Sequence, residues 1–348
     1  MVKNQKAQLT AIEKIELADC PMPVLGPDKV IVKVEYCGIC GSDIHFFSHG
    51  CIGKKVAPLP FVLGHECSGT VVEVGEDVHT LKTGDRVALE PGIPCGKCEY
   101  CCDGRYNLCP DVVFMAAPPY DGALYNYLSH PANMCFKLPD HVTMQEGAMI
   151  EPLAVGLHAA RRGGARLGKS VFILGSGTIG IMTLLACKAM GATQIIISDL
   201  LENRLMRAKE FGANLIINSS NCDPAEKVME ATNGQGCDIV FETAGSPITM
   251  AQTWKYVKRG GVIVVVGNIS KETSYNFLEI SRREVDIRPV FRYRNIYPLA
   301  IEAVSNGLIG LKGIQPKEFP LDQSQKAFDY TVHNAQNIIK TLIKVSDI

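Results

Sequence analysis

The stretch SVFILGSGTIG, residues 170–180, decides the fold of the second half of this 348-residue chain. An apolar run that leads into Gly175-Ser-Gly177-Thr178-Ile179-Gly180 predicts a buried strand, a tight glycine turn and the start of a helix. Gly175 permits the turn, Gly177 lets the backbone approach a phosphate, and Gly180 lets the helix pack on the strand. Because a helix N-terminus offers free N–H groups and a positive dipole end, the stretch predicts a dinucleotide site.

Apolar strands alternate with helices on the carboxyl side of this stretch. The expected strands are QIIIS, LIIN, CDIVFET, VIVVVG and residues 285–290, and one expected helix is ENRLMRAKEF. Asp223-Pro224 and Ser246-Pro247 each supply an N-cap and a first-turn proline, and the second pair should start a helix through TMAQTWKYVK. Six strands with intervening helices predict an α/β fold, a doubly wound parallel sheet of the Rossmann dinucleotide-binding type, over residues 154–290.

A carboxylate follows the second strand of this series. Asp199 lies 19 residues after Gly180, where it can accept both hydroxyls of an adenosine ribose and repel a 2′-phosphate. The position therefore favours NAD over NADP. Two alternatives stay open: Asp199 could cap a helix, and Arg204 is close enough in sequence to reach the same ribose.

The first part of the chain has a different texture. KVIVKVEY, SGTVVEVG and GDRVALE are short strand candidates between glycine-rich breaks, which predicts a β-barrel-like domain with little regular helix. Residues 91–119 are rich in Cys, Pro and Gly and are expected to form a loop. The C-terminal segment, with the helix YPLAIEAVSNG and polar strands, should rejoin this domain, giving it residues 1–153 and 291–348.

Charge and hydropathy exclude several classes of protein. Lys and Arg number 35 against 36 Asp and Glu, a net charge of −1, whereas nucleic-acid or anionic-membrane binding requires a basic excess. No apolar run approaches the ~18 residues of a membrane span, and the start MVKNQKAQLT lacks the apolar stretch of a secretory signal. We expect a soluble, cytoplasmic protein without a nucleic-acid or membrane partner.

Five of the fourteen cysteines lie close together in the expected loop. Cys95, Cys98, Cys101 and Cys109 form C-x2-C-x2-C-x7-C, which is typical of a closed, tetrahedral structural zinc site. Cys102 could replace Cys101, and a fortuitous cluster is the other alternative. The singly scattered cysteines are expected to be small buried hydrophobic residues.

A second constellation combines sulfur, nitrogen and oxygen. Cys40 lies in CGICGSDIH, His65 and Glu66 follow the strand-like FVL, and Glu151 opens EPLA near the predicted domain boundary. Each alone is more often a buried thiol, a satisfied polar residue or a surface carboxylate. Together they are typical of a catalytic zinc with one position left for water or substrate.

These motifs together resemble the zinc-dependent medium-chain dehydrogenase/reductase family. CGICGSDIH, GHECSGTVVEVG, GDRV, the four-cysteine lobe, EPLAVGLHA and GSGTIG run in family order over nearly the whole chain. Residues 114–122 and 291–298 are similar to the substrate-pocket segments of the sorbitol (polyol) dehydrogenase branch. The resemblance implies a GroES-like β-barrel catalytic domain joined to the Rossmann domain, and a homo-oligomer, either a dimer or a tetramer.

The resemblance also implies roles for individual residues. Cys40, His65 and Glu66 would ligate zinc, and Glu151 would do so directly or through the bound water. The remaining implied residues are Ser42 and His45 near a proton relay and Phe114, Arg292 and Tyr293 along the substrate channel. Phe46 stands in that channel where animal sorbitol dehydrogenases have tyrosine, and Ala117 where they have threonine, so two hydroxyls are missing. For Arg292, an interdomain salt bridge is the alternative.

The predicted function is hydride transfer between a sugar alcohol and NAD, giving the ketose, with zinc as Lewis acid. Three alternatives differ in class: a threonine or secondary-alcohol dehydrogenase on the same scaffold, a non-catalytic cofactor-binding relative, and a zinc-ribbon nucleic-acid module at Cys95–Cys109. The four candidate zinc ligands weigh against the second, and the near-neutral charge weighs against the third. The sequence leaves open which polyol is used, and in which direction.

Overall fold

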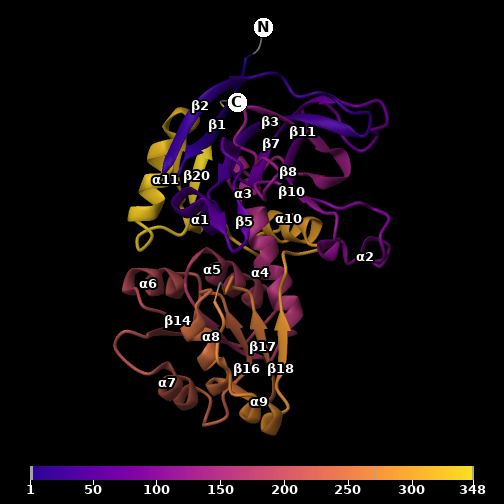
Figure 1. The fold of residues 1–348 in the computed structure, drawn as a ribbon. Helices are drawn as coiled ribbons and strands as arrows, with labels where there is room; N and C mark the ends of the chain where they lie inside the picture. The colour runs from indigo at the N-terminus through magenta and orange to yellow at the C-terminus, as the bar shows by residue number, and fades with distance from the viewer. Residues whose placement is uncertain (1–2, 270, 347–348) are drawn as a thin grey trace. The chain divides into compact units, whose positions relative to one another are not determined.

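The computed structural model describes residues 3–269 and 271–346. The chain forms two compact units, unit 1 (Met1–Glu151 and Tyr297–Ile348) and unit 2 (Pro152–Ile296), whose elements are drawn in Figure 1. The sequence-based boundaries, after residues 153 and 290, lie two and six residues away from these divisions. Among the described residues, no helix is both long and apolar enough to cross a bilayer.

Unit 2 is built on a six-stranded parallel sheet with the order β15-β14-β13-β16-β17-β18. The chain runs outward from β13 to one edge, returns, and then runs to the other edge, which is the doubly wound order with its switch point between β13 and β16. The strands are β13 (Ser170–Leu174), β14 (Gln194–Asp199), β15 (Leu215–Asn218), β16 (Cys237–Glu242), β17 (Val257–Val265) and β18 (Asp286–Pro289).

Helices connect these strands, as parallel strands require. They are α5 (Thr178–Ala189), α6 (Glu202–Glu210), α7 (Pro224–Ala231), α8 (Pro247–Gln252) and α9 (Phe277–Arg283). Asp223 and Ser246 cap α7 and α8 with their side chains and a proline follows each cap, as the sequence predicted. The sequence predicted that this last helix would continue to Lys258, and that prediction is wrong, because α8 ends at Gln252.

The reason is a buried tyrosine beyond α8. A 3-10 turn (Thr253–Lys255) follows the helix, and Tyr256 packs edge-on against Phe172 with ring centroids 4.8 Å apart. The Tyr256 carbonyl accepts the N–H of Cys237, and Val257 pairs with Cys237, so β17 begins five residues before the expected VIVVVG. Strand pairing here overrides local helix propensity.

Unit 1 is built mainly on a sheet with the order β12-β8-β7-β3-β20-β19, with β11 also paired to β3; all of its pairs are antiparallel except β19 with β20. Because β20 pairs with β3, the C-terminal segment completes the sheet that the N-terminal segment began. The strands are β3 (Lys29–Gly38), β7 (Glu66–Val74), β8 (Arg86–Leu89), β11 (Tyr127–Pro131), β12 (Cys135–Lys137), β19 (Lys317–Pro320) and β20 (Thr341–Lys344).

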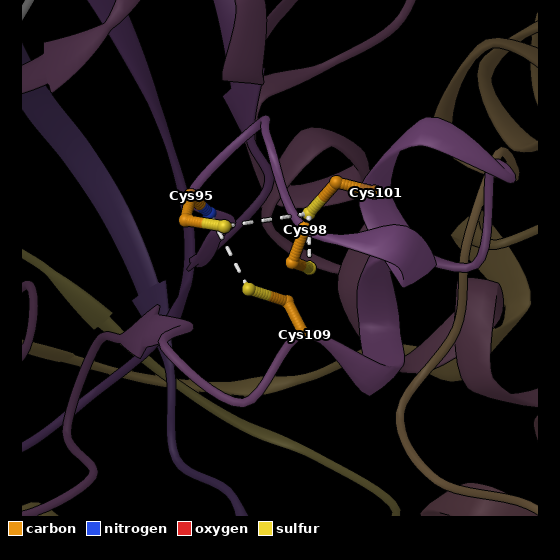
Figure 2. Close-up of side chains that lie close together, drawn as sticks. All are labelled: Cys95, Cys98, Cys101 and Cys109. Atoms are coloured by element: carbon orange, nitrogen blue, oxygen red, sulfur yellow. Dashed lines mark hydrogen bonds between the residues drawn. The ribbon is translucent and has the colours of Figure 1, made fainter.

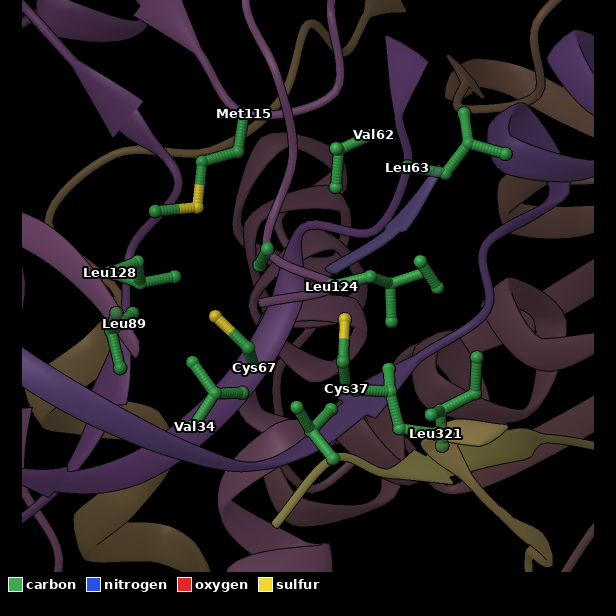
Figure 3. Close-up of a cluster of buried hydrophobic side chains, with 14 of the residues drawn as sticks. Val34, Cys37, Val62, Leu63, Cys67, Leu89, Met115, Leu124, Leu128 and Leu321 are labelled. Carbon is green, nitrogen blue, oxygen red and sulfur yellow. The ribbon is translucent and has the colours of Figure 1, made fainter. Parts of the chain in front are cut away.

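A smaller sheet, β2-β1-β6, faces the same core. Its strands are β1 (Asn4–Ala11), β2 (Lys14–Cys20) and β6 (Phe61–Val62). Figure 3 shows the apolar side chains that fill this core, among them Val34, Leu63, Leu89 and Leu124, each 1% exposed or less. Cys37 and Cys67 lie among them as small apolar residues, and burial raises the pKa of the Cys67 thiol to about 12.

Unit 1 holds more helix than the sequence predicted. The expectation of little helix missed α1 (Gly41–His49), which lies between β3 and β7, because its glycine- and histidine-containing sequence has weak helical periodicity. The expected loop at 91–119 also contains a short strand pair, β9 (Gly92–Ile93) with β10 (Val113–Phe114), and the helix α2 (Glu99–Cys102). The other α-helices and strands of unit 1 are β4 (Cys51–Ile52), β5 (Lys55–Val56), α3 (Met144–Ala148), α10 (Tyr297–Ser305) and α11 (Ser324–His333). Helix α4 (Ile150–Gly163) begins in unit 1 and continues into unit 2.

The scattered cysteines divide by burial. Cys135, Cys187 and Cys237 are buried, as expected of small apolar residues. Cys222 is exposed, and Cys20 and Cys51 are partly exposed, so the expectation is wrong for these three.

Candidate active site

Three unlike side chains converge where β3 ends and β7 begins. Cys40 follows β3 and caps the N-terminus of α1, while His65 precedes β7 and Glu66 is its first residue. The antiparallel register places Gly38 opposite Glu66, so the two chain segments lie side by side. As a result, one ligand atom from each of Cys40, His65 and Glu66 lies within 4.8 Å of the other two.

Asp43, which sequence reasoning missed, ties two of these segments together. Its Oδ2 accepts the Cys40 N–H at 2.9 Å, and its Oδ1 accepts the Gly64 N–H at 3.0 Å and lies 3.6 Å from His65 Nδ1. Although burial alone would raise the pKa of Asp43, His65 and the two N–H groups hold it below its ordinary value. An acidic residue three positions after a helix cap could have revealed it, since that spacing lets a carboxylate bond back to the cap.

Lys340, also missed, supplies the counter-charge to Glu66. Its Nζ forms an ion pair with Glu66 Oε2 and donates to the Ile39 carbonyl at 2.9 Å, and both charged side chains are fully buried. Burial alone would lower the pKa of Lys340, but Glu66 and then Cys40 raise it above its ordinary value. Lys340 directly precedes β20, about 270 residues from Glu66, so no local pattern could have linked them.

The pKa of His65 is determined by its burial and by its neighbours Asp43 and Cys40. Burial alone would lower the pKa of the imidazole, but the Asp43 carboxylate and the Cys40 thiol outweigh it and raise the pKa well above its ordinary value. A metal ion binds thiolate and neutral imidazole, so binding at this site must displace protons. Sulfur, nitrogen and oxygen donors at this separation fit zinc, with a fourth position available to water or substrate.

Glu151 is buried in the first turn of α4 but is not one of the three converging donors. Its charge contributes to the raised pKa values of Lys340 and Cys67, which places it in the same electrostatic neighbourhood. Glu90, at the end of β8, belongs there too. Burial, with a smaller contribution from Glu151, raises the pKa of Glu90 to about 7, although Tyr106 donates a hydrogen bond to it at 2.8 Å.

The other predicted residues of unit 1 lie on α1 and β10. Phe114 packs beside the donors, its ring centroid 5.6 Å from that of His65. Ser42 is partly buried and His45 exposed, one helical turn apart on α1. Phe46 turns into the hydrophobic core, where its ring meets that of Phe61 edge-on at 5.9 Å.

The four predicted cysteines of the Cys-rich segment face one another, as Figure 2 shows. Cys98 Sγ lies 3.4 Å from Cys101 Sγ, and Cys95 Sγ lies 4.0 Å from it. These separations are too long for disulfides and bracket the roughly 3.8 Å between thiolates that share a tetrahedral zinc at 2.3 Å. Cys102 Sγ instead faces the Lys97 carbonyl at 3.7 Å, so Cys101 is the member of the cluster.

The glycine turn of unit 2 has the conformation that its sequence suggested. Gly175 has φ +97°, and a Cβ at Gly180 would collide with the Gly175 carbonyl oxygen. At Gly177, the N-cap of α5, the nearest atom to such a Cβ would be an Arg204 nitrogen at 3.8 Å, so this side of the turn is open. Thr178 and Ile179 form the first turn of α5, the end of the helix whose dipole favours an anion.

Asp199 is held at the end of β14. Its Oδ2 accepts the Ser176 N–H at 2.7 Å and its Oδ1 accepts the Leu201 N–H at 3.0 Å. Arg204 Nη1 lies 3.9 Å from Asp199 Oδ2, so both residues that bear on cofactor choice are at this corner.

Arg292 and Tyr293 belong to unit 2, after β18. Arg292 has a strained φ of +55° and its guanidinium stacks on the Phe291 ring, 4.8 Å from the centroid. Such strain is concentrated at functional sites. Tyr293 is buried.

Comparison with known proteins agrees with the predicted resemblance. Residues 26–140 match the family model "Alcohol dehydrogenase GroES-like domain" and residues 178–306 match "Zinc-binding dehydrogenase". An uncharacterized zinc-type alcohol dehydrogenase-like protein of Escherichia coli is 48% identical over 99% of this chain and 100% of its own length. Sorbitol dehydrogenase of Bacillus subtilis is 41% identical over 98% of this chain and 97% of its own length.

Solved structures show the same fold. A dehydrogenase of unknown specificity from Escherichia coli superposes with a TM-score of 0.96 at 47% identity, covering 99% of this chain and 100% of that one. A zinc-binding dehydrogenase from Sinorhizobium meliloti, bound to NADP, has a TM-score of 0.91 at 30% identity, with coverage of 99% and 100%. This chain, with its GroES-like domain and its Rossmann-type domain, is therefore an oxidoreductase of the zinc-dependent alcohol dehydrogenase family, and sorbitol dehydrogenases are among its relatives.

Proposed function

We propose that this protein oxidises a secondary hydroxyl of a small polyol to a ketone, or reduces the ketose, with NAD as the hydride carrier. The observation that carries the proposal is the convergence of a thiol, an imidazole and a carboxylate within 4.8 Å, because that donor set suits a catalytic zinc with an open position. Identity to sorbitol dehydrogenase along nearly the whole chain supports a polyol as the substrate.

The proposal gives one task to each of the two domains predicted from the sequence. Residues 1–153 and 291–348 would hold zinc and substrate, and residues 154–290 would hold the dinucleotide. Cys40, His65 and Glu66 would bind the zinc, with Glu151 as a further ligand, direct or through water. When bound, zinc supplies Lewis-acid polarisation of the substrate oxygen.

The residues of the chain perform the proton transfer and the positioning. The proton of the substrate hydroxyl would leave through water and the Ser42 hydroxyl, which gives up its own proton as it accepts one, and then through His45, which is exposed. A bound nicotinamide would supply the hydride acceptor, so that one alcohol and one oxidised cofactor would give one ketone, one reduced cofactor and one proton. The planar guanidinium of Arg292 would bond the neighbouring hydroxyls, and Phe114 would wall the channel beside His65.

NAD rather than NADP is proposed because Asp199 is fixed with its carboxylate at the end of β14. A 2′-phosphate would meet this negative charge, while Arg204 at 3.9 Å would attract it, so the balance decides. Measuring kcat/KM for both cofactors in wild-type protein and in Asp199→Ala tests this. We expect a preference for NAD that Asp199→Ala reduces by about tenfold or more, and an unchanged preference would contradict the role of Asp199.

The substrate is tested by a panel of sorbitol, xylitol, ribitol, threonine and 2,3-butanediol, followed by formation of the reduced cofactor. The proposal expects the highest kcat/KM on a pentitol or hexitol. It expects His65→Ala to lose bound zinc and turnover together, while His333→Ala, an exposed histidine on α11, keeps both. Full turnover in zinc-depleted protein would refute the proposal.

A second candidate substrate class is a secondary alcohol with fewer hydroxyls, or threonine. It is favoured by Ala117, which lacks the hydroxyl that the animal enzymes carry at the matching position. The same panel decides, since this alternative expects 2,3-butanediol or threonine to exceed every pentitol and hexitol.

We further propose a homo-oligomer, dimer or tetramer, in the cytoplasm. The support is family resemblance. Light scattering on the purified protein tests the assembly, and a monomer at micromolar concentration would contradict it.

A further inference from the structure

A hollow of about 260 Å³ in unit 2 is lined by four arginines, a histidine and an asparagine. Three lining residues come from the last turns of α4, one from β18 and two from the segment after it; they are His158, Arg161, Arg162, Arg288, Arg294 and Asn295. Among the residues that the structure describes, no acidic one lines the hollow. None of the six has a part in the zinc, cysteine or dinucleotide sites described above.

Hydrogen bonds to backbone carbonyls hold this cluster, which we call the arginine hollow, in place. Arg288 Nη1 donates to the Arg162 carbonyl at 3.0 Å, and Arg161 Nη1 donates to the Asn295 carbonyl at 3.4 Å. These bonds join the end of α4 to the segment after β18. Carbonyl groups position guanidinium groups without cancelling their charge, so the hollow is a preformed cationic site.

Negative charges next to the arginine hollow reduce its positive potential. Asp286 Oδ2 lies 2.6 Å from Arg288 Nη2, outside the lining of the hollow. The C-terminus of α4 adds the equivalent of roughly half a negative charge. Four arginines line this small concave surface together, which gives it a positive potential.

A buried histidine, His158, also lines the hollow, and the neighbouring arginines affect its pKa. His158 is 6% exposed, and burial, followed by Arg294, Arg161 and Arg162, lowers its pKa to about 4. The imidazole is therefore neutral near pH 7, where it can donate a hydrogen bond to an anion without adding a further charge.

We propose that the arginine hollow binds a small phosphate-class oxyanion, either free phosphate or the phosphate group of a small ester. Paired guanidinium forks match phosphate oxygens in geometry and supply charge-assisted hydrogen bonds. A volume of about 260 Å³ holds a phosphate group and a few attached atoms but no dinucleotide. A bound phosphate would place about two negative charges among arginine side chains that otherwise repel one another.

The test is isothermal titration calorimetry of the full-length protein at fixed ionic strength, with NADH present so that the glycine turn is filled. The titrants are inorganic phosphate, a polyol monophosphate and the same polyol without phosphate. We expect saturable binding of at least one phosphate titrant. The bare polyol, which the proposed function places at the zinc site, should give the same signal in wild-type protein and in Arg161→Gln/Arg162→Gln. The tighter of the two phosphate titrants identifies the source, a free ion or an ester.

Variants separate this site from diffuse attraction. We expect Arg161→Gln/Arg162→Gln to weaken phosphate binding tenfold or more, and Arg162→Lys, which keeps the charge but not the fork, to weaken it less. Arg282→Gln removes an exposed arginine that pairs with Glu279 on α9 and should leave binding unchanged. Circular dichroism melting checks that each variant is folded.

Three outcomes would overturn the proposal. They are absence of phosphate binding to wild-type protein, equal weakening by Arg282→Gln and by the double substitution, and a change of oligomeric state in the double variant without any phosphate binding. The last would mean that carboxylates of a second copy meet these arginines. Neither the zinc nor the polyol proposal depends on the result, so the two can fail separately.

Discussion

Replacing Lys340 by methionine removes one charge from the most deeply buried ion pair at the candidate active site. Methionine keeps much of the apolar stem, so the change acts mainly on the charge. Glu66 Oε2 loses its cationic partner, and the Ile39 carbonyl loses the hydrogen bond that it accepts at 2.9 Å. Breaking a buried pair from one side costs about 3–5 kcal/mol, because the remaining charge is uncompensated.

The size of the loss should depend on metal. In chelator-treated protein we expect Lys340→Met to lower the free energy of unfolding of unit 1 by about 3–5 kcal/mol. In zinc-loaded protein a cation beside Glu66 replaces part of the missing charge, and we expect roughly half that loss or less. The difference between the two conditions therefore measures whether Glu66 faces a bound cation.

Urea unfolding followed by hydrogen exchange is the appropriate assay. The single tryptophan, Trp254, lies in unit 2, so tryptophan fluorescence would follow the wrong unit. Exchange of amides in α1 and β20 reports unit 1 directly. Lys326→Met, an exposed lysine on α11, is the matched control and should change the free energy by no more than about 0.5 kcal/mol. A loss below about 1 kcal/mol in metal-free protein, or an equal loss with and without zinc, would refute the reasoning.

The remaining predictions concern the cysteine cluster, a buried histidine and the glycine turn. Cys101→Ser should release one zinc per chain and lower the melting temperature, whereas Cys102→Ser should do neither; metal analysis with calorimetry distinguishes them. Burial lowers the pKa of His130 to about 4, so between that value and about 6.5 the unfolded chain binds more protons and stability rises with pH by up to ~3 kcal/mol. His130→Gln should reduce this rise of stability with pH in urea titrations from pH 4 to 7. The rise that remains is due to His158, whose pKa burial also lowers to about 4. An unchanged slope would contradict the contribution of His130. Gly180→Ala places a methyl group against the Gly175 carbonyl oxygen. We expect weaker NADH binding by fluorescence titration and a loss of about 1–3 kcal/mol in the free energy of unfolding. NADH binding with wild-type affinity would contradict this prediction.

Sequence predicts unit 2 well because its signals are local. Each strand is a short apolar run, and each cap or turn is written within a few residues, as Asp223-Pro224 shows. Strand β17 departs from its prediction because its first residue is chosen by pairing with Cys237, some 20 residues earlier, rather than by its own neighbours.

The candidate site was accessible from sequence only in part. Cys40, His65 and Glu66 stood out by donor type and by family resemblance, and the antiparallel register of β3 and β7 explains why they meet. Lys340 and the arginine hollow depend on contacts between segments more than 100 residues apart, such as Arg288 with the Arg162 carbonyl at a separation of 126. Periodicity describes which face a side chain takes, not which distant segment packs there.

The most direct test of the central claim is to count zinc ions per chain while measuring polyol turnover in wild-type protein and His65→Ala. The account predicts two zinc ions in wild-type protein, one for each cluster of donors, and one in His65→Ala, with turnover reduced by about a thousandfold or more. Two zinc ions in His65→Ala, or wild-type turnover with only one, would contradict it.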